Sequence, residues 1–137
     1  MPDTDCDFEI TFDQQRLDFR TVSDWLMASY WGGKRTDALH RSAFANSICA
    51  IALAEGRLVG FGRAAGDRAL FARISDVIVA PNHRGKGIGK ALVQALLAHP
   101  ELATVSTWTL NTADAHRLYA QFGFRRVHDG NEMRLDR

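Results

Sequence analysis

The segment from Ala69 to Leu110 limits the folds open to this chain more than any other part. A run rich in apolar and β-branched residues, Ala69 to Ala80, predicts a buried strand. After a glycine-rich stretch, apolar residues recur at helical spacing until Pro100, and Thr104 to Leu110 predicts another strand. A strand–helix–strand unit in one sheet requires parallel strands and a right-handed crossover. At least one strand pair is therefore predicted to be parallel.

Shorter patterns on either side of this unit complete the predicted architecture. With 137 residues and 46% hydrophobic content, the chain is large enough for a single domain, residues 1–137. The pattern favours an α/β fold with a mixed, mostly antiparallel sheet flanked by helices. The further predicted elements are a strand at Phe8–Phe12, helices at Thr21–Ser29 and Thr36–Asn46, a hairpin of Ile48–Ala54 and Leu58–Ala64, a helix that Asp114 caps and Gly123 ends, and closing strands near Phe124–Val127 and Glu132–Leu135.

Charge and composition exclude several classes of function. The formal net charge is +1, so no overall field draws the chain to nucleic acid or to a membrane surface. No apolar run approaches the roughly 20 residues of a membrane-spanning helix, and the acidic N-terminal stretch predicts no signal peptide. Cys6 and Cys49 form neither a disulfide framework nor a metal-type spacing. We expect a cytoplasmic protein without a bound metal.

The stretch PNHRGKGIGK, residues 81–90, places alternating glycines among cations between a strand and a helix. The first turn of a helix has free N–H groups and the positive end of the helix dipole, so it binds phosphate readily. Glycines let phosphate oxygens approach the backbone. Neither the P-loop nor the dinucleotide fingerprint fits, because Arg84 and Lys90 stand where those patterns need glycine. The stretch therefore predicts a polyphosphate site of another type.

Two segments together carry a resemblance to a known family. Arg84-x-x-Gly87-x-Gly89 resembles the coenzyme A pyrophosphate motif Q/R-x-x-G-x-G/A of the GNAT acetyltransferase superfamily. The segment from Asn111 to Phe124, with Leu118-Tyr119 and Gly123-Phe124, resembles that family's second characteristic segment. The predicted order of strands and helices extends the resemblance over nearly the whole chain. The resemblance implies an enzyme that transfers the acetyl group of acetyl-CoA to an amine.

In such a protein, acetyl-CoA would bind where the two parallel strands splay apart. The backbone of the first strand would hold the pantetheine arm, the glycine stretch would hold the pyrophosphate, and a polar residue would follow the second strand. The side chains of that first strand would also serve as core residues, and the polar residue could equally be a plain turn residue. The residues that match these positions are Val77, Ile78, Val79, Arg84, Gly85, Lys86, Gly87, Ile88, Gly89, Lys90 and Asn111.

The resemblance also implies two catalytic residues. Tyr119 matches the family's usual general acid, which gives a proton to the departing thiolate of coenzyme A; otherwise it is a core tyrosine on an apolar helix face. The amine nucleophile must lose a proton, because a free alkylamine has a pKa near 10.4. Asp76 is the candidate base; alternatively its carboxylate forms a salt bridge, for instance with Arg73 or Arg63.

The acceptor is expected to be a primary amine of a small molecule or an amino acid, which attacks directly in a ternary complex. The candidate acceptor-binding residues are Tyr30, Trp31, Phe71 and Trp108, and the aromatic pair next to Gly32-Gly33 could equally be a packed loop. A non-catalytic domain that binds or senses coenzyme A is the alternative, although a proton donor beside the thiol favours an enzyme. The resemblance further implies pairing into a homodimer through the last strand.

Overall fold

A five-stranded mixed sheet forms the centre of the molecule. The structure is a computed structural model, and it describes residues 7–29, 33–127 and 130–137. Within these residues the strands lie in the order in which they occur in the chain, and only the last pair, β4 with β5, is parallel. The strands are β1 (Glu9–Thr11), β2 (Ile48–Ala54), β3 (Arg57–Gly66), β4 (Phe71–Val79) and β5 (Thr107–Thr109). The predicted fold class is confirmed.

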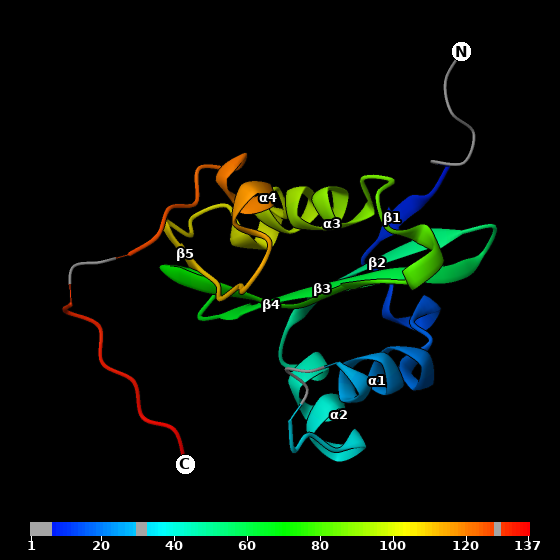
Figure 1. The fold of residues 1–137 in the computed structure, drawn as a ribbon, viewed down its shortest axis with the longest axis horizontal. Helices are drawn as coiled ribbons and strands as arrows, with labels where there is room; N and C mark the ends of the chain where they lie inside the picture. Colours follow the sequence, from blue (N-terminus) through cyan, green and yellow to red (C-terminus); the bar gives the residue numbers. More distant parts are fainter. Residues whose placement is uncertain (1–6, 30–32, 128–129) are drawn as a thin grey trace.

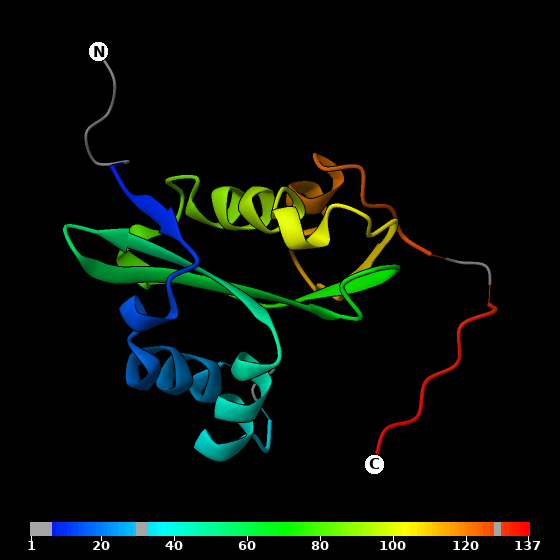
Figure 2. The ribbon, with the colours of Figure 1, turned by 180° about the vertical axis from the view of Figure 1, so that it is seen from behind.

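Helices cover both faces of this sheet. Figures 1 and 2 show α1 (Phe19–Ala28) and α2 (Asp37–Ala45) on one face, and α3 (Ile88–Leu97) and α4 (His116–Ala120) on the other. Asp18 and Thr36 cap the first two helices by accepting hydrogen bonds from backbone N–H groups of the first turn. Short 3₁₀ turns at Gln14–Arg16, Pro81–His83 and Pro100–Leu102 connect the elements.

The core has one apolar layer on each face of the sheet. Under α1 and α2, Leu26 and Phe44 pack against Ile51 and Phe61 of the sheet. Under α3, Leu92 and Leu96 pack against the opposite faces of β2 and β3. The near-continuous burial of β2 agrees with a central strand that is covered on both sides.

Glycines in β3 bring α3 unusually close to the sheet. An added Cβ at Gly60 would lie 2.9 Å from Cγ2 of Ile88, the first residue of α3, and 3.1 Å from Cδ1 of Leu92. An added Cβ at Gly62 would lie 3.2 Å from Cγ2 of Val77. The absence of a side chain at Gly60 therefore lets the first turn of α3 lie close to β3.

The two parallel strands separate soon after they pair. The ladder between β4 and β5 covers Phe71 to Arg73 and ends at the pair Arg73–Thr109, whereas β4 continues to Val79. Beyond Arg73, this edge of β4 pairs with no described strand. The predicted strand at Thr104–Leu110 is thus shorter than expected, because only three of its residues meet β4 before the strands diverge.

The two predicted closing strands are wrong. In the described residues, neither 124–127 nor 132–135 forms a strand. Phe124 packs against the Tyr119 ring, with ring centroids 5.9 Å apart, so its apolar character serves the core instead of a ladder. Met133 and Leu135 are exposed and have no sheet partner. Figure 1 shows this last segment as an irregular trace that is not part of the sheet.

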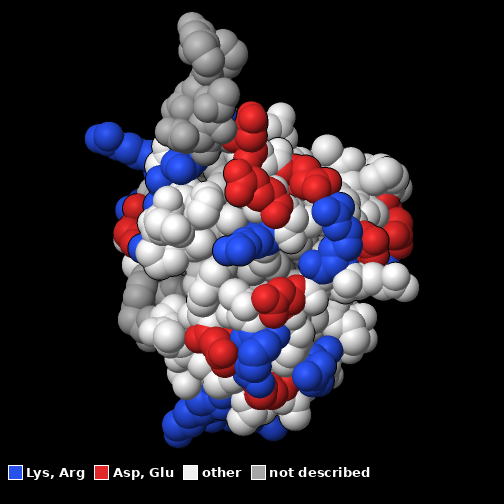
Figure 3. Space-filling view, turned by 90° about the vertical axis from the view of Figure 1, so that its right-hand side faces the viewer, with Lys and Arg blue, Asp and Glu red and all other residues white. Residues whose placement is uncertain are grey.

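Charges of both signs are interspersed on the face that Figure 3 shows, without a field of one sign. None of the described helices has the length and apolar character needed to cross a bilayer.

Candidate active site

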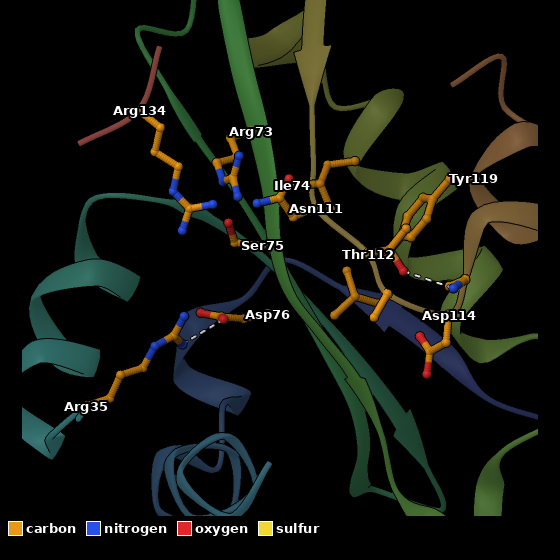
Figure 4. Close-up of a pocket in the computed structure, with 13 residues that line it drawn as sticks. Arg35, Arg73, Ile74, Ser75, Asp76, Asn111, Thr112, Asp114, Tyr119 and Arg134 are labelled. Carbon is orange, nitrogen blue, oxygen red and sulfur yellow. Dashed lines mark hydrogen bonds and ion pairs between the residues drawn. The ribbon is translucent and has the colours of Figure 1, made fainter. Parts of the chain in front are cut away.

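A cleft of about 630 Å³ opens where β4 and β5 diverge. β4 forms its floor, and the segment between β5 and α4 forms one wall (Figure 4). Its lining combines cations, carboxylates and hydroxyl groups with a few apolar side chains. The lining residues are Arg35, Arg73, Ile74, Ser75, Asp76, Val77, Asn111, Thr112, Ala113, Asp114, Ala115, Tyr119 and Arg134.

A second cleft, of about 510 Å³, shares part of this lining. Arg73, Asn111, Thr112 and Tyr119 border both clefts. The second cleft adds Trp108 and the segment from Phe124 to Val127. The residues between β5 and α4 therefore form a partition that has a hollow on each side.

Asp76 lies at an irregularity in β4. Arg63 of β3 pairs with Ser75, and Phe61 pairs with Ile78, so β4 holds one extra residue in this interval. Asp76 has a φ of 59°, in the left-handed region that aspartate tolerates better than most residues. The bulge breaks the alternation of side chains and brings the Asp76 carboxylate to the cleft.

Two guanidinium groups hold the buried Asp76 carboxylate. Arg35 Nη1 donates to Oδ1 and Arg63 Nε donates to Oδ2, both at 2.7 Å, and only 2% of the aspartate side chain is exposed. The Arg63 partner agrees with the salt-bridge alternative that the sequence left open. Arg35 is a partner that the sequence did not indicate. Because each carboxylate oxygen already accepts a charged hydrogen bond, the geometry supports a structural role, and the role as a base stays a prediction.

Tyr119 is the buried tyrosine of the cleft. It belongs to one buried cluster with Ile74 of β4 and Val93 of α3, and 8% of the residue is exposed. Burial raises the pKa of Tyr119 above its ordinary value, and the negative charge of Asp114 raises it further. The phenol therefore keeps its proton throughout the neutral range. Tyr119 is thus a core residue, as the alternative interpretation of the sequence held, and it also lines the cleft. Its role as general acid stays a prediction.

The glycine stretch forms the entry to α3. Gly87 precedes the helix in the left-handed region, with φ of 83°, and no described side chain caps the first turn. Gly85 has a similar φ of 79°, and an added Cβ at either glycine would meet no atom within 4 Å. Arg84 donates to the Val79 carbonyl oxygen at 3.4 Å, which joins the loop to the end of β4. The first N–H groups of α3 are thus without a side-chain cap among the described residues, and Lys86 and Lys90 flank them in the sequence.

The other predicted coenzyme-binding residues lie along one path. Val77 lines the cleft, and Ile78 and Val79 continue β4 toward the glycine stretch. The unpaired edge of β4 offers backbone groups along this path. Asn111 lies just beyond β5 on the opposite wall. Of the predicted coenzyme-binding residues, Val77 on the floor and Asn111 on the wall line the first cleft, whereas Ile78, Val79 and residues 84–90 lie outside its lining.

The predicted acceptor-binding residues do not lie together in the first cleft. Tyr30 and Trp31 lie outside the described residues. Trp108 borders the second cleft and also packs into the core. Phe71 begins β4, is 53% exposed, and does not line the first cleft. Their roles stay predictions.

Several residues that line the first cleft were not predicted from the sequence. Arg35 follows the aromatic stretch, and Arg134 lies in the last segment; neither position carries a motif. Thr112 accepts a hydrogen bond of 2.9 Å from the backbone N–H of Ala115, which shapes the turn before α4. Ser75 has the pattern of an ordinary strand residue in the sequence. Alternation along β4 from Arg73 to Ser75 was the signal that could have identified it.

Comparison with known proteins agrees with this geometry. The sequence model of a protein family, described as the acetyltransferase (GNAT) domain, matches residues 45–126 of this chain. A curated relative, an uncharacterized N-acetyltransferase named ycf52 from Pyropia yezoensis, is 35% identical over 94 residues, which cover 68% of this chain and 54% of the relative. The chain thus spans about half the length of the curated relative.

Solved structures share the fold. A GNAT family protein from Xanthomonas campestris pv. campestris superposes with a TM-score of 0.84 and 37% identity, over 88% of this chain and 86% of that chain. Glucosamine-6-phosphate N-acetyltransferase from Arabidopsis thaliana superposes with a TM-score of 0.65 and 19% identity, over 95% and 99% of the two chains. Because the sequence identity to the Arabidopsis enzyme is only 19%, that similarity shows a shared fold alone.

Proposed function

Because this chain belongs to the GNAT family of acetyltransferases, we propose that it transfers the acetyl group of acetyl-CoA to the primary amine of a small molecule or an amino acid. The observation that carries the proposal is the arrangement along β4. An unpaired strand edge leads from a cleft that contains Tyr119 to an uncapped helix start rich in glycine. Such an arrangement suits an extended ligand with a thioester at one end and phosphates at the other.

The residues present fit the coenzyme. Gly85 and Gly87 leave open space where side chains would otherwise stand, and the free N–H groups of α3 favour an anion. Arg84, Lys86 and Lys90 add positive charge around this point. In the proposal, residues 84–90 hold the pyrophosphate, and the backbone of Val77, Ile78 and Val79, with Asn111 opposite, holds the pantetheine arm.

Bound acetyl-CoA would supply an activated acyl group as a thioester. Tyr119 Oη holds the proton that a departing thiolate needs, since its raised pKa keeps the phenol protonated. The apolar neighbours Ile74 and Val93 fix the ring, so the proton donor is positioned before the ligands arrive. A direct attack by the amine, without an acyl-enzyme, agrees with the placement of Cys49 in the core away from this cleft.

Asp76 is proposed to orient the cleft floor through Arg35 and Arg63, and its assignment as the general base remains to be tested. A base must accept a proton from the amine directly or through water. In the structure, both oxygens of the Asp76 carboxylate already accept hydrogen bonds from guanidinium groups. An altered pH dependence of turnover in Asp76→Asn would indicate that Asp76 is the general base. An unaltered pH dependence would indicate that it only orients the cleft floor.

Calorimetric titration with acetyl-CoA, and separately with free coenzyme A, tests the proposal first. We expect both to bind in the micromolar range, after which amines are screened by release of the coenzyme A thiol. Binding without thiol release from any amine would favour the alternative, a coenzyme A-sensing domain. If the folded protein binds neither ligand, the proposal is wrong.

A further inference from the structure

Arginine side chains gather along one wall of the first cleft, beside its β4 floor. Arg35 and Arg63 share the single carboxylate of Asp76. Arg73 and Arg134 also line the cleft. Asp114 is the other carboxylate of the lining, and Figure 4 shows it on the far side of β4 from these arginines. The side of the cleft that faces α1 and α2 is therefore cationic.

Arg73 is the cation of this wall that lacks an internal acceptor. It forms no ion pair or hydrogen bond with any other described residue through its side chain. Its backbone is fixed on both sides, since Arg73 pairs with Ala65 of β3 and with Thr109 of β5. The residue is exposed, and Ser75 follows it on the same face of the strand. A rigid strand thus presents an unpaired guanidinium beside a hydroxyl group.

A second guanidinium faces the first. Figure 4 shows the side chains of Arg73 and Arg134 directed toward the same space above Ser75. Arg134 has an exposed partner, Asp136, at 3.0 Å, so its charge is partly balanced. Two like charges directed at one space repel each other unless an anion lies between them. Guanidinium groups bind carboxylate and phosphate oxygens in a bidentate manner, which suits this arrangement.

We propose that the acceptor amine carries an oxyanion, a carboxylate or a phosphate, which Arg73 binds with help from Ser75 and Arg134. This inference rests on the proposed acetyl transfer and names the class of acceptor for the same site. Arg73 lines the cleft together with Tyr119, so an acceptor held by its anion keeps its amine in the cavity that contains the proton donor. Neutral amines and polyamines lack the group that this wall recognises.

Matched acceptors test the inference. The carboxylate arm compares an amino acid with its carboxamide, and the phosphate arm compares phosphoethanolamine with ethanolamine. Each pair is assayed for kcat/KM by thiol release at equal pH. We expect the anionic member of at least one pair to be preferred about tenfold or more, mainly through KM, as for a charge-assisted bidentate contact. The arm that shows the preference identifies the oxyanion.

Variants assign the preference to Arg73. Arg73→Gln should bring the ratio of the two kcat/KM values close to one, and Arg73→Lys should retain part of it. Arg57→Gln, at the exposed cation that begins β3, should leave the ratio unchanged. Equal use of both members of each pair, or an unchanged ratio in Arg73→Gln, would overturn the inference while leaving acetyl transfer intact.

A binding measurement covers the case in which none of these amines is the acceptor. Calorimetry of phosphoethanolamine and of the amino acid, each added to protein saturated with free coenzyme A, should show binding that Arg73→Gln removes. Absence of binding by both anions to the coenzyme-loaded protein also overturns the inference. Failure to bind coenzyme A at all would instead count against the proposed function.

Discussion

The Asp76 carboxylate and the Arg63 guanidinium form an ion pair of 2.7 Å across the bulge between β3 and β4. Only 2% of the Asp76 side chain and 15% of the Arg63 side chain are exposed, so water screens the pair little. Removing one member of a buried pair leaves the other without compensation, which costs about 3 kcal/mol or more.

Asp76→Asn should therefore lower the free energy of unfolding by about 3 kcal/mol, measured by urea denaturation. Asparagine tolerates the positive φ of this position, so the loss reports the charge and not the backbone. Glu101→Gln is the matched control, because Glu101 pairs with Arg68 at 2.8 Å on the surface and should lose less than about 1 kcal/mol. Equal losses in the two variants would show that burial does not strengthen the Asp76 pair.

Tyr119→Phe should lower kcat for acetyl transfer about 100-fold and leave the dissociation constant of acetyl-CoA within about twofold. The substitution removes the proton donor and keeps the ring that packs against Ile74 and Phe124. Stopped assays of thiol release and calorimetry give the two quantities. An unchanged kcat would remove Tyr119 from the mechanism, and a matching loss of affinity would indicate a binding role instead.

Gly87→Ala should weaken acetyl-CoA binding at least about tenfold, the equivalent of one charge-assisted hydrogen bond. The control is Gly56→Ala in the β2–β3 turn. Both glycines have positive φ, 83° and 76°, and both have open space around an added Cβ. Each variant should lose about 1–2 kcal/mol of stability from the left-handed backbone. Loss of affinity in Gly87→Ala alone places the pyrophosphate at the start of α3, and equal affinities would place it elsewhere.

His40 should make stability depend on pH. It is 2% exposed, Ser23 Oγ lies 2.7 Å from its Nδ1, and Nε2 has no partner among the described residues. Burial lowers the pKa of His40 below its ordinary 6.5; the charges of Arg35 and Arg63 lower it further, and those of Asp76 and Asp37 oppose the shift.

The unfolded chain consequently binds the proton first as the pH falls. The free energy of unfolding should be highest above pH 6.5 and should decrease as the pH falls below that value, until the folded state is protonated as well. Urea midpoints between pH 5 and pH 8 measure this slope. His40→Gln should flatten the curve, whereas His116→Gln, which changes a histidine outside this cluster, should keep it. A flat curve in the unmodified protein would contradict the assignment.

Cys49 should be inert toward thiol reagents in the folded protein. Burial raises the pKa of the Cys49 thiol to about 12, and 1% of the residue is exposed. In a Cys6→Ser background, a disulfide reagent should label the protein only after denaturant is added. Rapid labelling at pH 8 without denaturant would show that the α1–α2 layer opens readily.

The strand–loop–helix–strand unit could be predicted because its signals are local. An apolar run, a glycine stretch and a helical period follow one another between Ala69 and Leu110, and the parallel pair then follows from chain topology. Strand β2 at Ile48–Ala54 was predicted with the observed bounds, because turn residues mark its end and its interior is apolar throughout.

The features that could not be predicted depend on contacts between residues far apart in the sequence, which a local sequence pattern does not reveal. The closing strands were predicted from alternation alone, yet Met133 and Leu135 meet no sheet edge. The Arg35–Asp76 pair joins residues 41 positions apart, so neither residue reveals it. The sequence suggests Arg73 as a possible partner of Asp76. In the structure Arg35 and Arg63 are the partners of Asp76, and Arg73 lines the cleft.

The backbone at position 76 limits how this cleft can change during evolution. A φ of 59° favours glycine, asparagine and aspartate, so few single substitutions there keep the bulge. Asparagine keeps the shape of the side chain and loses its charge, and glycine keeps the backbone conformation alone. Glutamate, the usual alternative acid, would strain the chain. A lineage that needs different chemistry at this point must therefore rebuild the strand first, or recruit its new group from the more permissive positions around it.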